Sequence, residues 1–241
     1  MFTLIAICIG SLLFAVVGFV LGGLIEGVER KISARMQGRV GPKIRQPFWD
    51  IAKLLHKENA STNAAEHTYV MCALVFLIIS GGVFYAGSNL LLCIVLSTLS
   101  TLFFVMAAYS SRSPFSTAGG AREILQVLSY EPMEYFMAIV FYILIGSFDV
   151  VATALQSAPL ITYGWPVFIG MLLIQLVKLR KSPFDLSTAH AAHQELMQGT
   201  LTEMSGPTFA KAKLMHWYEI VLMLGWTGMF FIDAQPVSWA I

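Results

Sequence analysis

The chain has 241 residues, of which 57% are hydrophobic and only 12% are charged, and its formal net charge is +1. Soluble domains carry about 25% charged residues, so this composition excludes an ordinary soluble protein, and the near-zero net charge argues against nucleic acid as a partner. We expect an all-α membrane protein in which residues 1–241 form a single polytopic membrane domain.

Six apolar runs are long enough to cross about 30 Å of hydrocarbon as helices. They are Phe2–Ile25, Tyr69–Ala86, Asn89–Tyr109, Glu123–Gly146, Trp165–Leu179 and Trp217–Asp233. The first has no positively charged segment in front of it and is too long for a signal-peptide core, so we expect it to be retained. The fifth is short, and we expect its helix to begin earlier, near Leu160.

All fifteen lysines and arginines lie in segments that six alternating spans place on one side of the membrane. The connections on the opposite side, near residues 87–88 and 148–159, contain none. By the positive-inside rule, we expect the N-terminus outside and the large basic loops in the cytoplasm. The expected location is therefore the cytoplasmic (inner) membrane of a prokaryote.

The three cysteines, Cys8, Cys72 and Cys93, fall inside separate apolar runs. Scattered thiols among apolar residues suit buried small side chains better than disulfides or metal ligands. Because iron–sulfur clusters need several grouped thiolates, we expect this chain to hold no cluster of its own.

A short helix is predicted between the first and second spans. Pro47 is suited to the first helical position, and Phe48, Ile51, Ala52 and Leu55 then share one face. At about twelve residues the helix is too short to span, so we expect it to lie in the membrane surface or against a partner.

The fourth span is unusually rich in polar residues. At about 100° per residue, Glu123, Gln126, Tyr130 and Glu134 fall on one stripe, with Glu131 beside it. Carboxylates within a span are expensive unless paired, hydrated or neutral, so they indicate function. The alternative is a polar contact between packed helices.

Two further features surround this stripe. Ser113–Pro114 and Gly119–Gly120 predict a structured turn before the span. Pro132 should free the Leu128 carbonyl and kink the helix.

The longest polar stretch, residues 178–213, separates the last two spans. It is roughly ten times longer than a simple connection needs, which favours a functional loop. Ser187 or Thr188 could cap a short helix, and Gly199 could end it. The titratable side chains in this loop include Asp185, His190, His193, Glu195 and Glu203.

These residues do not complete the sites that several common reactions require. His190 and His193 share a helix face, but Glu195 points away, and a zinc site with two ligands is incomplete. Neither a nucleophile elbow nor a Gly-rich phosphate loop is present in the sequence. Buried carboxyls and histidines remain, and a file of such groups leading from a loop into the bilayer is what a proton relay requires.

The sequence also resembles a known family. Residues 29–31 and 37–42 resemble the ERK…QxRxGP signature of the subunit of proton-pumping NADH dehydrogenase (complex I) that joins the membrane arm to the peripheral arm. Its GALR…SYE segment is matched at 120–122 and 129–131, and its PFDLPEAE…EL…TEYSG loop at 183–186, 195–196 and 202–206.

The chain departs from that family in three ways. The family has closely spaced acids after PFDL, whereas residues 189–195 read AHAAHQE, and an AHQE loop is similar to that of energy-converting membrane-bound [NiFe] hydrogenases. Met204 replaces the usual tyrosine. The family usually has about eight spans, counted by apolar length, and we count six.

The resemblance implies a membrane anchor and coupling subunit of a ferredoxin-linked, ion-translocating [NiFe] hydrogenase complex. It implies as partners the hydrogenase large and small subunits, an antiporter-like membrane subunit and a ferredoxin-linked iron–sulfur subunit. The [NiFe] centre and the iron–sulfur clusters would lie in those partners, and this chain would hold no redox centre, metal or catalytic residue.

On this interpretation two sets of residues carry the function. The docking surface would contain Arg35, Arg39, Lys43, Arg45, Arg122 and Arg180. The proton path would contain Glu123, Tyr130, Glu131, Glu134, Asp185, His190, His193, Glu195 and Glu203. The alternatives are a quinone- or methanophenazine-site subunit of a complex I-like dehydrogenase, a stand-alone ion transporter, and a purely structural anchor.

Overall fold

A computed structural model describes residues 2–58, 63–156, 158–181, 184–185, 187 and 198–232. In these ranges the chain is helical, and its one β-bridge joins Asn89 to Asp149. The elements are α1 (Phe2–Met36), α2 (Gln46–His56), α3 (Ala64–Tyr85), α4 (Leu90–Ser110), α5 (Pro114–Ile145), α6 (Val150–Ala154), α7 (Ile161–Lys178), η1 (Gly199–Leu201) and α8 (Gly206–Gly228). The prediction of an all-α membrane protein is confirmed.

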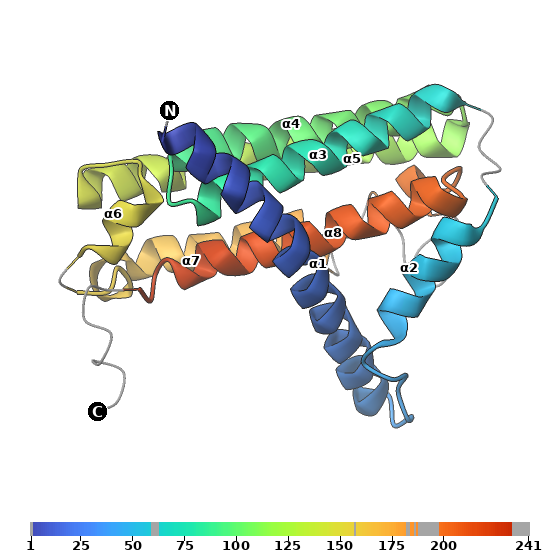
Figure 1. The fold of residues 1–241 in the computed structure, drawn as a ribbon, viewed down its shortest axis with the longest axis horizontal. Coiled ribbons are helices and arrows are strands. Elements are labelled where there is room, and N and C mark those ends of the chain that lie inside the picture. Colours follow the sequence, from blue (N-terminus) through green and yellow to red (C-terminus); the bar gives the residue numbers. More distant parts are fainter. Residues whose placement is uncertain are drawn as a thin grey trace.

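The long helices α3, α4, α5, α7 and α8 run lengthwise through the molecule, while α1 crosses them obliquely (Figure 1). In the described ranges, five helices are long and apolar enough to cross a membrane: α1, α3, α4, α5 and α7. The fifth predicted span does begin close to Leu160, since α7 starts at Ile161.

The sixth predicted span differs from its prediction. We expected an apolar run from Trp217, but α8 begins at Gly206 and carries Lys211, Lys213 and Glu219, so it is less apolar than the five others. It nevertheless supplies much of the core, because Trp217 and Trp226 are fully buried. It packs against α1, α2, α3 and α7.

Two other boundaries also differ from the sequence prediction. The first helix continues from Ile25 to Met36, because its first break comes at Gly38, whose φ of +73° ends the helix. The predicted turn at Gly119–Gly120 is wrong, because both glycines lie inside α5. A side chain on Gly119 would collide with the backbone of Thr200, so this glycine allows η1 to approach the helix.

The predicted helix at Pro47 is confirmed as α2, with Pro47 in its first turn. The ring of Phe48 lies 5.4 Å from the rings of both Phe19 on α1 and Trp217 on α8. The apolar face of α2 therefore packs against this chain's own helices.

Candidate functional site: a buried ion-pair network

The polar stripe of α5 faces the interior, as its spacing predicted. Glu123, Gln126, Tyr130 and Glu134 are all buried, and the residue exposure of Glu134 is 0%. The helix continues through Pro132 to Ile145. The acids therefore require partners from other helices, since an unpaired charge at such a position is destabilising by several kcal/mol.

Lys178, the last residue of α7, is the partner of Glu134. Its Nζ lies 2.8 Å and 3.1 Å from the two carboxylate oxygens and donates to Ser97 Oγ at 3.0 Å. The same ammonium lies 5.3 Å from the ring centroids of Tyr130 and Trp226, within range of a cation–π contact. Both members of the pair are buried, with side-chain exposures of 1% and 0%.

Arg180, two residues further along, holds the other acids. Its Nη2 donates to Glu123 at 2.6 Å and its Nε contacts both oxygens of that carboxylate at 3.0 and 3.1 Å. Its Nη1 lies 3.6 Å from Glu219 on α8. Burial alone would lower the pKa of Arg180, but the carboxylates of Glu123 and Glu219 more than offset that effect and raise it.

The network contains more acids than fixed cations. Glu123, Glu134 and Glu219 are buried carboxyls, whereas Lys178 and Arg180 are the fixed cations that contact them. If all five groups are ionised, one negative charge is in excess. A buried excess charge is destabilising, so the set is chemically suited to take up one proton.

Glu219 is the acid with the weakest contacts. One of its buried oxygens, Oε2, has no hydrogen-bond partner in the described structure, and it lies 3.6 Å from Arg180 and 3.9 Å from His216 Nδ1. His216 is partly exposed, at 31% of its side chain. The His216–Glu219 pair is therefore the place where the network comes closest to the surface in the described part of the chain.

Glu131 lies apart from this network. It is partly buried on the outward side of α5, and Tyr135 Oη donates to it at 3.4 Å. With Leu128, Pro132, Phe136 and Ile139 it also lines a shallow hollow of about 320 Å³. Glu131 and Glu134, which we both assigned to the predicted proton path, thus face different environments.

The loop residues of the predicted path are only partly placed. Asp185 is partly buried and Glu203 is exposed. His190, His193 and Glu195 lie outside the described residues, as does most of the predicted helix between Ser187 and Gly199.

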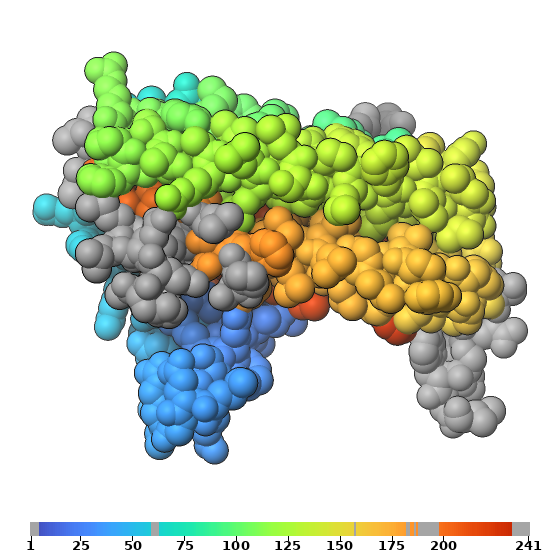
Figure 2. Space-filling model, turned by 180° about the vertical axis from the view of Figure 1, so that it is seen from behind, coloured from blue at the N-terminus to red at the C-terminus, as the bar shows by residue number. Residues whose placement is uncertain are grey.

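The predicted docking residues divide into two groups. Arg35, Arg39, Lys43 and Arg45 are exposed along the end of α1 and the following loop, which stand out from the body of the molecule (Figure 2). The remaining two predicted residues are Arg122, which is exposed on α5, and Arg180. Arg180 does not lie on this surface, because its guanidinium is buried between Glu123 and Glu219.

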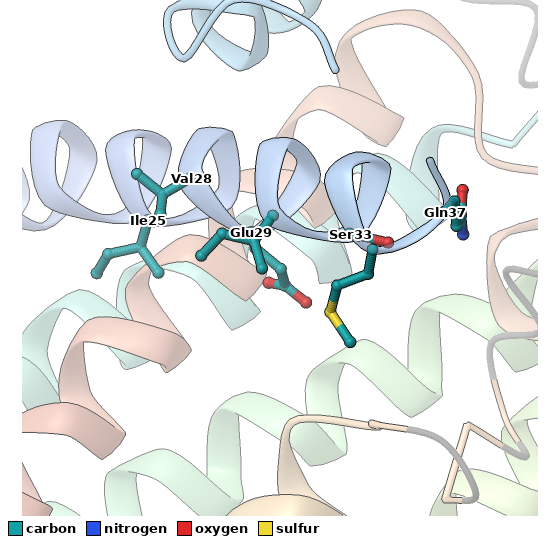
Figure 3. A pocket seen from close by; sticks show the side chains of 7 residues that line it. Ile25, Val28, Glu29, Ser33 and Gln37 are labelled. Carbon is teal, nitrogen blue, oxygen red and sulfur yellow. The ribbon is translucent and has the colours of Figure 1, made fainter. Parts of the chain in front are cut away.

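A groove of about 610 Å³ runs along the second half of α1. The groove is shallow and open, and within the described structure its lining comes from residues 25–37 alone. This lining is mostly apolar, with polar groups from Glu29, Ser33 and Gln37 on one side of the helix (Figure 3). Glu29 is also paired with Lys181, directly after the end of α7. The groove is thus linked by this ion pair to the segment that carries Lys178 and Arg180.

The described residues contain no group of three histidine, cysteine, aspartate or glutamate side chains that could hold a metal ion. Cys8 is exposed, Cys72 is partly buried and Cys93 is buried.

Sequence reasoning missed three members of the network. Lys178 was assigned to the polar loop, although it lies at the end of an apolar run and faces inward. Glu219 and Ser97 were passed over as isolated polar residues in apolar runs. An isolated acid in one span and a lysine at the end of another are the available signal, but only the fold shows that they meet.

Comparison with known proteins agrees with this architecture. The chain matches the family model described as NADH dehydrogenase over residues 9–240. It is 31% identical to an NADH-quinone oxidoreductase subunit of Bacillus cytotoxicus, over 93% of this chain and 75% of that protein. It is 29% identical to NADH-ubiquinone oxidoreductase chain 1 of Mycosarcoma maydis, over 88% of this chain and 69% of that protein.

A solved structure has the same fold. A chain of the membrane-bound sulfane sulfur reductase, an archaeal respiratory membrane complex, superposes with a TM-score of 0.83 at 22% identity, covering 94% of this chain and 79% of that one. The family match extends over almost the whole chain and includes every helix of the buried network. This multi-pass membrane protein therefore belongs to the NADH dehydrogenase family, as a membrane subunit of the complex I-like NADH/quinone oxidoreductase type.

Proposed function

We propose that this chain is the membrane anchor and coupling subunit of a ferredoxin-linked, ion-translocating [NiFe] hydrogenase complex in a prokaryotic cytoplasmic membrane. It docks the soluble redox module and carries the first part of the proton path. The AHAAHQE sequence at residues 189–195 supports the hydrogenase assignment by its resemblance to membrane-bound hydrogenases. The [NiFe] centre and the iron–sulfur clusters belong to partner subunits.

The observation that carries the coupling role is the buried ion-pair network. Structural contacts between helices need few charged groups, and replacing a buried ion pair by apolar residues is often neutral or stabilising. Here α5, α7 and α8 together bury three carboxyls around Lys178 and Arg180. A set of buried groups with one excess acid can bind and release a proton with little change in structure. A purely structural anchor does not need this property.

The proton enters this network from the His216 side. His216 is partly exposed and its Nδ1 lies 3.9 Å from Glu219 Oε2, so the imidazole is the surface-side neighbour of that carboxyl. Arg180 lies between Glu219 and Glu123, and Lys178 holds Glu134 further along α5. A proton bound to Glu219 weakens its attraction for Arg180, and of these two acids Glu123 alone then holds the guanidinium.

The segment after α7 links this network to the docking side. Arg180 has a φ of 51°, a conformation that is uncommon for a residue with a side chain and indicates a backbone held by its surroundings. Lys181 pairs with Glu29 near the groove on α1. The backbone that carries Arg180 is therefore joined through Lys181 to α1, the helix whose end carries the proposed docking residues.

The identity of the complex is tested by purifying it through a tag on this chain from native membranes. We expect the hydrogenase large and small subunits, an antiporter-like subunit, bound nickel, and hydrogen evolution from reduced ferredoxin. Recovery of NADH- or quinone-reducing subunits without nickel would contradict the hydrogenase assignment.

One observation favours a second candidate function, a quinone- or methanophenazine-site subunit. The groove on α1 has mostly apolar walls with polar groups from Glu29, Ser33 and Gln37, which suits the ring and tail of such a carrier. The named relatives are quinone and ubiquinone oxidoreductase subunits. Labelling of residues 25–37 by a photoreactive quinone, suppressed by excess unlabelled quinone, would favour this candidate, and unsuppressed labelling would remove it.

A further inference from the structure

The outward side of α2 carries an aromatic and basic stripe. Trp49, Lys53, His56 and Lys57 are separated by four, three and one residues, which places them on one side of the helix. All four are exposed, and 65% of Trp49 is accessible. We call these residues the α2 stripe.

The orientation of α2 is fixed by its other side. Pro47 and Ile51 are buried, and Phe48 packs against Trp217. Asp50, the one acid inside α2, is paired with Arg30 of α1 at 2.7 Å. The α2 stripe is therefore held facing away from the protein core.

The position of α2 relative to the bilayer follows from its contacts with α1. Large apolar side chains along α1 are exposed, among them Leu12 at 71% and Val16 at 66%, as expected for a wall that faces lipid. α2 contacts the basic end of this same helix through Arg30. It lies at an angle to the long helices, near the end of α8 that begins at Gly206 (Figure 1). Basic residues flank a span where it leaves the hydrocarbon, so the contact with Arg30 places α2 at the boundary between hydrocarbon and headgroups.

The chemistry of the α2 stripe suits that level. Tryptophan is enriched where hydrocarbon meets headgroups, and lysines extend along apolar surface while their ammonium groups reach phosphate. His56 Nδ1 is engaged by the carbonyl of Ala52 at 2.8 Å, so its other ring nitrogen points outward. The exposed acid next to the α2 stripe is Glu58, so with Lys53 and Lys57 positive charge predominates on this surface.

We propose that the α2 stripe binds the headgroups of anionic phospholipids in the leaflet where α1 ends. Basic residues on an interfacial amphipathic helix attract anionic lipid, and Trp49 anchors the same face at the boundary. Because the stripe is distinct from the buried network and from the groove on α1, this inference holds whichever electron acceptor the complex uses.

A lipid titration tests the role of the lysines. The intact complex, purified in detergent, is titrated with phosphatidylglycerol or phosphatidylcholine, and bound lipid is counted by native mass spectrometry. We expect preference for phosphatidylglycerol, and a loss of affinity of roughly fivefold for each lysine removed in Lys53→Gln and Lys57→Gln. Arg112→Gln, at an exposed position beyond α4, is the charge-matched control and should leave binding unchanged. Equal binding of both lipids, or equal loss in the control, would overturn the proposal.

A photocrosslinking experiment distinguishes lipid from protein as the occupant. Trp49 is replaced by p-benzoyl-phenylalanine and the complex is irradiated in vesicles that contain phosphatidylglycerol. The proposal requires a mass increase equal to one phospholipid. A crosslink to another subunit would overturn it and identify the α2 stripe as a protein-docking surface instead.

Discussion

Two parts of the chain use the same residue types in opposite ways. In the buried network, Lys178 and Arg180 are enclosed by acids from α5 and α8. At the end of α1 and in the following loop, Arg35, Arg39 and Lys43 are exposed. A cation surrounded by acids in low dielectric influences proton occupancy, whereas an exposed cation influences which surface it meets. The proposed coupling and docking roles therefore differ in the environment of the side chains rather than in residue type.

The largest expected effect on stability comes from removing the buried ammonium group of Lys178. Lys178→Met leaves Glu134 buried without its partner, which should destabilise the chain by about 3–5 kcal/mol. The double variant Glu134→Gln/Lys178→Met removes both charges and should recover most of that loss. Thermal unfolding of the purified complex measures the stability changes of this double-mutant cycle.

The matched exposed control is Lys31→Met, for which we expect a change within about 0.5 kcal/mol. A Lys178→Met variant as stable as this control would mean that the Lys178–Glu134 contact does not contribute as the structure indicates. The buried and the exposed lysine would then contribute equally to stability, contrary to the difference that we infer between the two environments.

A smaller effect is expected on docking. Arg39→Gln and Lys43→Gln should leave the stability of the membrane part unchanged but lower the fraction of complexes that retain the soluble module. Since exposed charges are screened, the loss should grow with salt. Subunit ratios after washing membranes at increasing ionic strength provide the measurement. Loss of the membrane subunits themselves would indicate a folding role for these residues.

The smallest effect concerns the contact that holds α2 to α1. Partial burial of Asp50 would raise its pKa, but hydrogen bonds from Arg30 and Gln46 outweigh that effect and lower it. A carboxyl with a lowered folded-state pKa stabilises the protein above its unfolded-state value, and that contribution is lost as pH falls through the folded-state pKa. Asp50→Asn should therefore reduce stability by no more than about 1 kcal/mol near neutral pH and by nothing in strong acid. Proteolysis of the loop before α2, followed against pH, measures it.

Much of the fold could be predicted because apolar length and helix signals are local. Pro47 predicted the start of α2, and the spacing of Glu123, Tyr130 and Glu134 predicted their shared buried face. Helix ends were less predictable where no breaker marks them, as between Ile25 and Gly38.

The partners within the site could not be predicted in the same way. Lys178 and Arg180 are neighbours in a run of basic residues, and no local pattern indicates that both turn inward. Their acids come from helices far away in sequence, so tertiary packing decides the pairing. Glu131 and Glu134 differ by only three positions, yet one faces outward beside Pro132 and the other is fully buried.

Glu134→Gln tests most directly whether the buried network carries a proton during turnover, as we propose. Glutamine keeps the size of the side chain but cannot carry the proton. Acidification of inverted vesicles is measured alongside electron transfer and subunit content, with Glu58→Gln as an exposed control. We expect Glu134→Gln complexes to assemble and transfer electrons while pumping falls, and the control to pump normally. Full pumping in assembled Glu134→Gln complexes would contradict it.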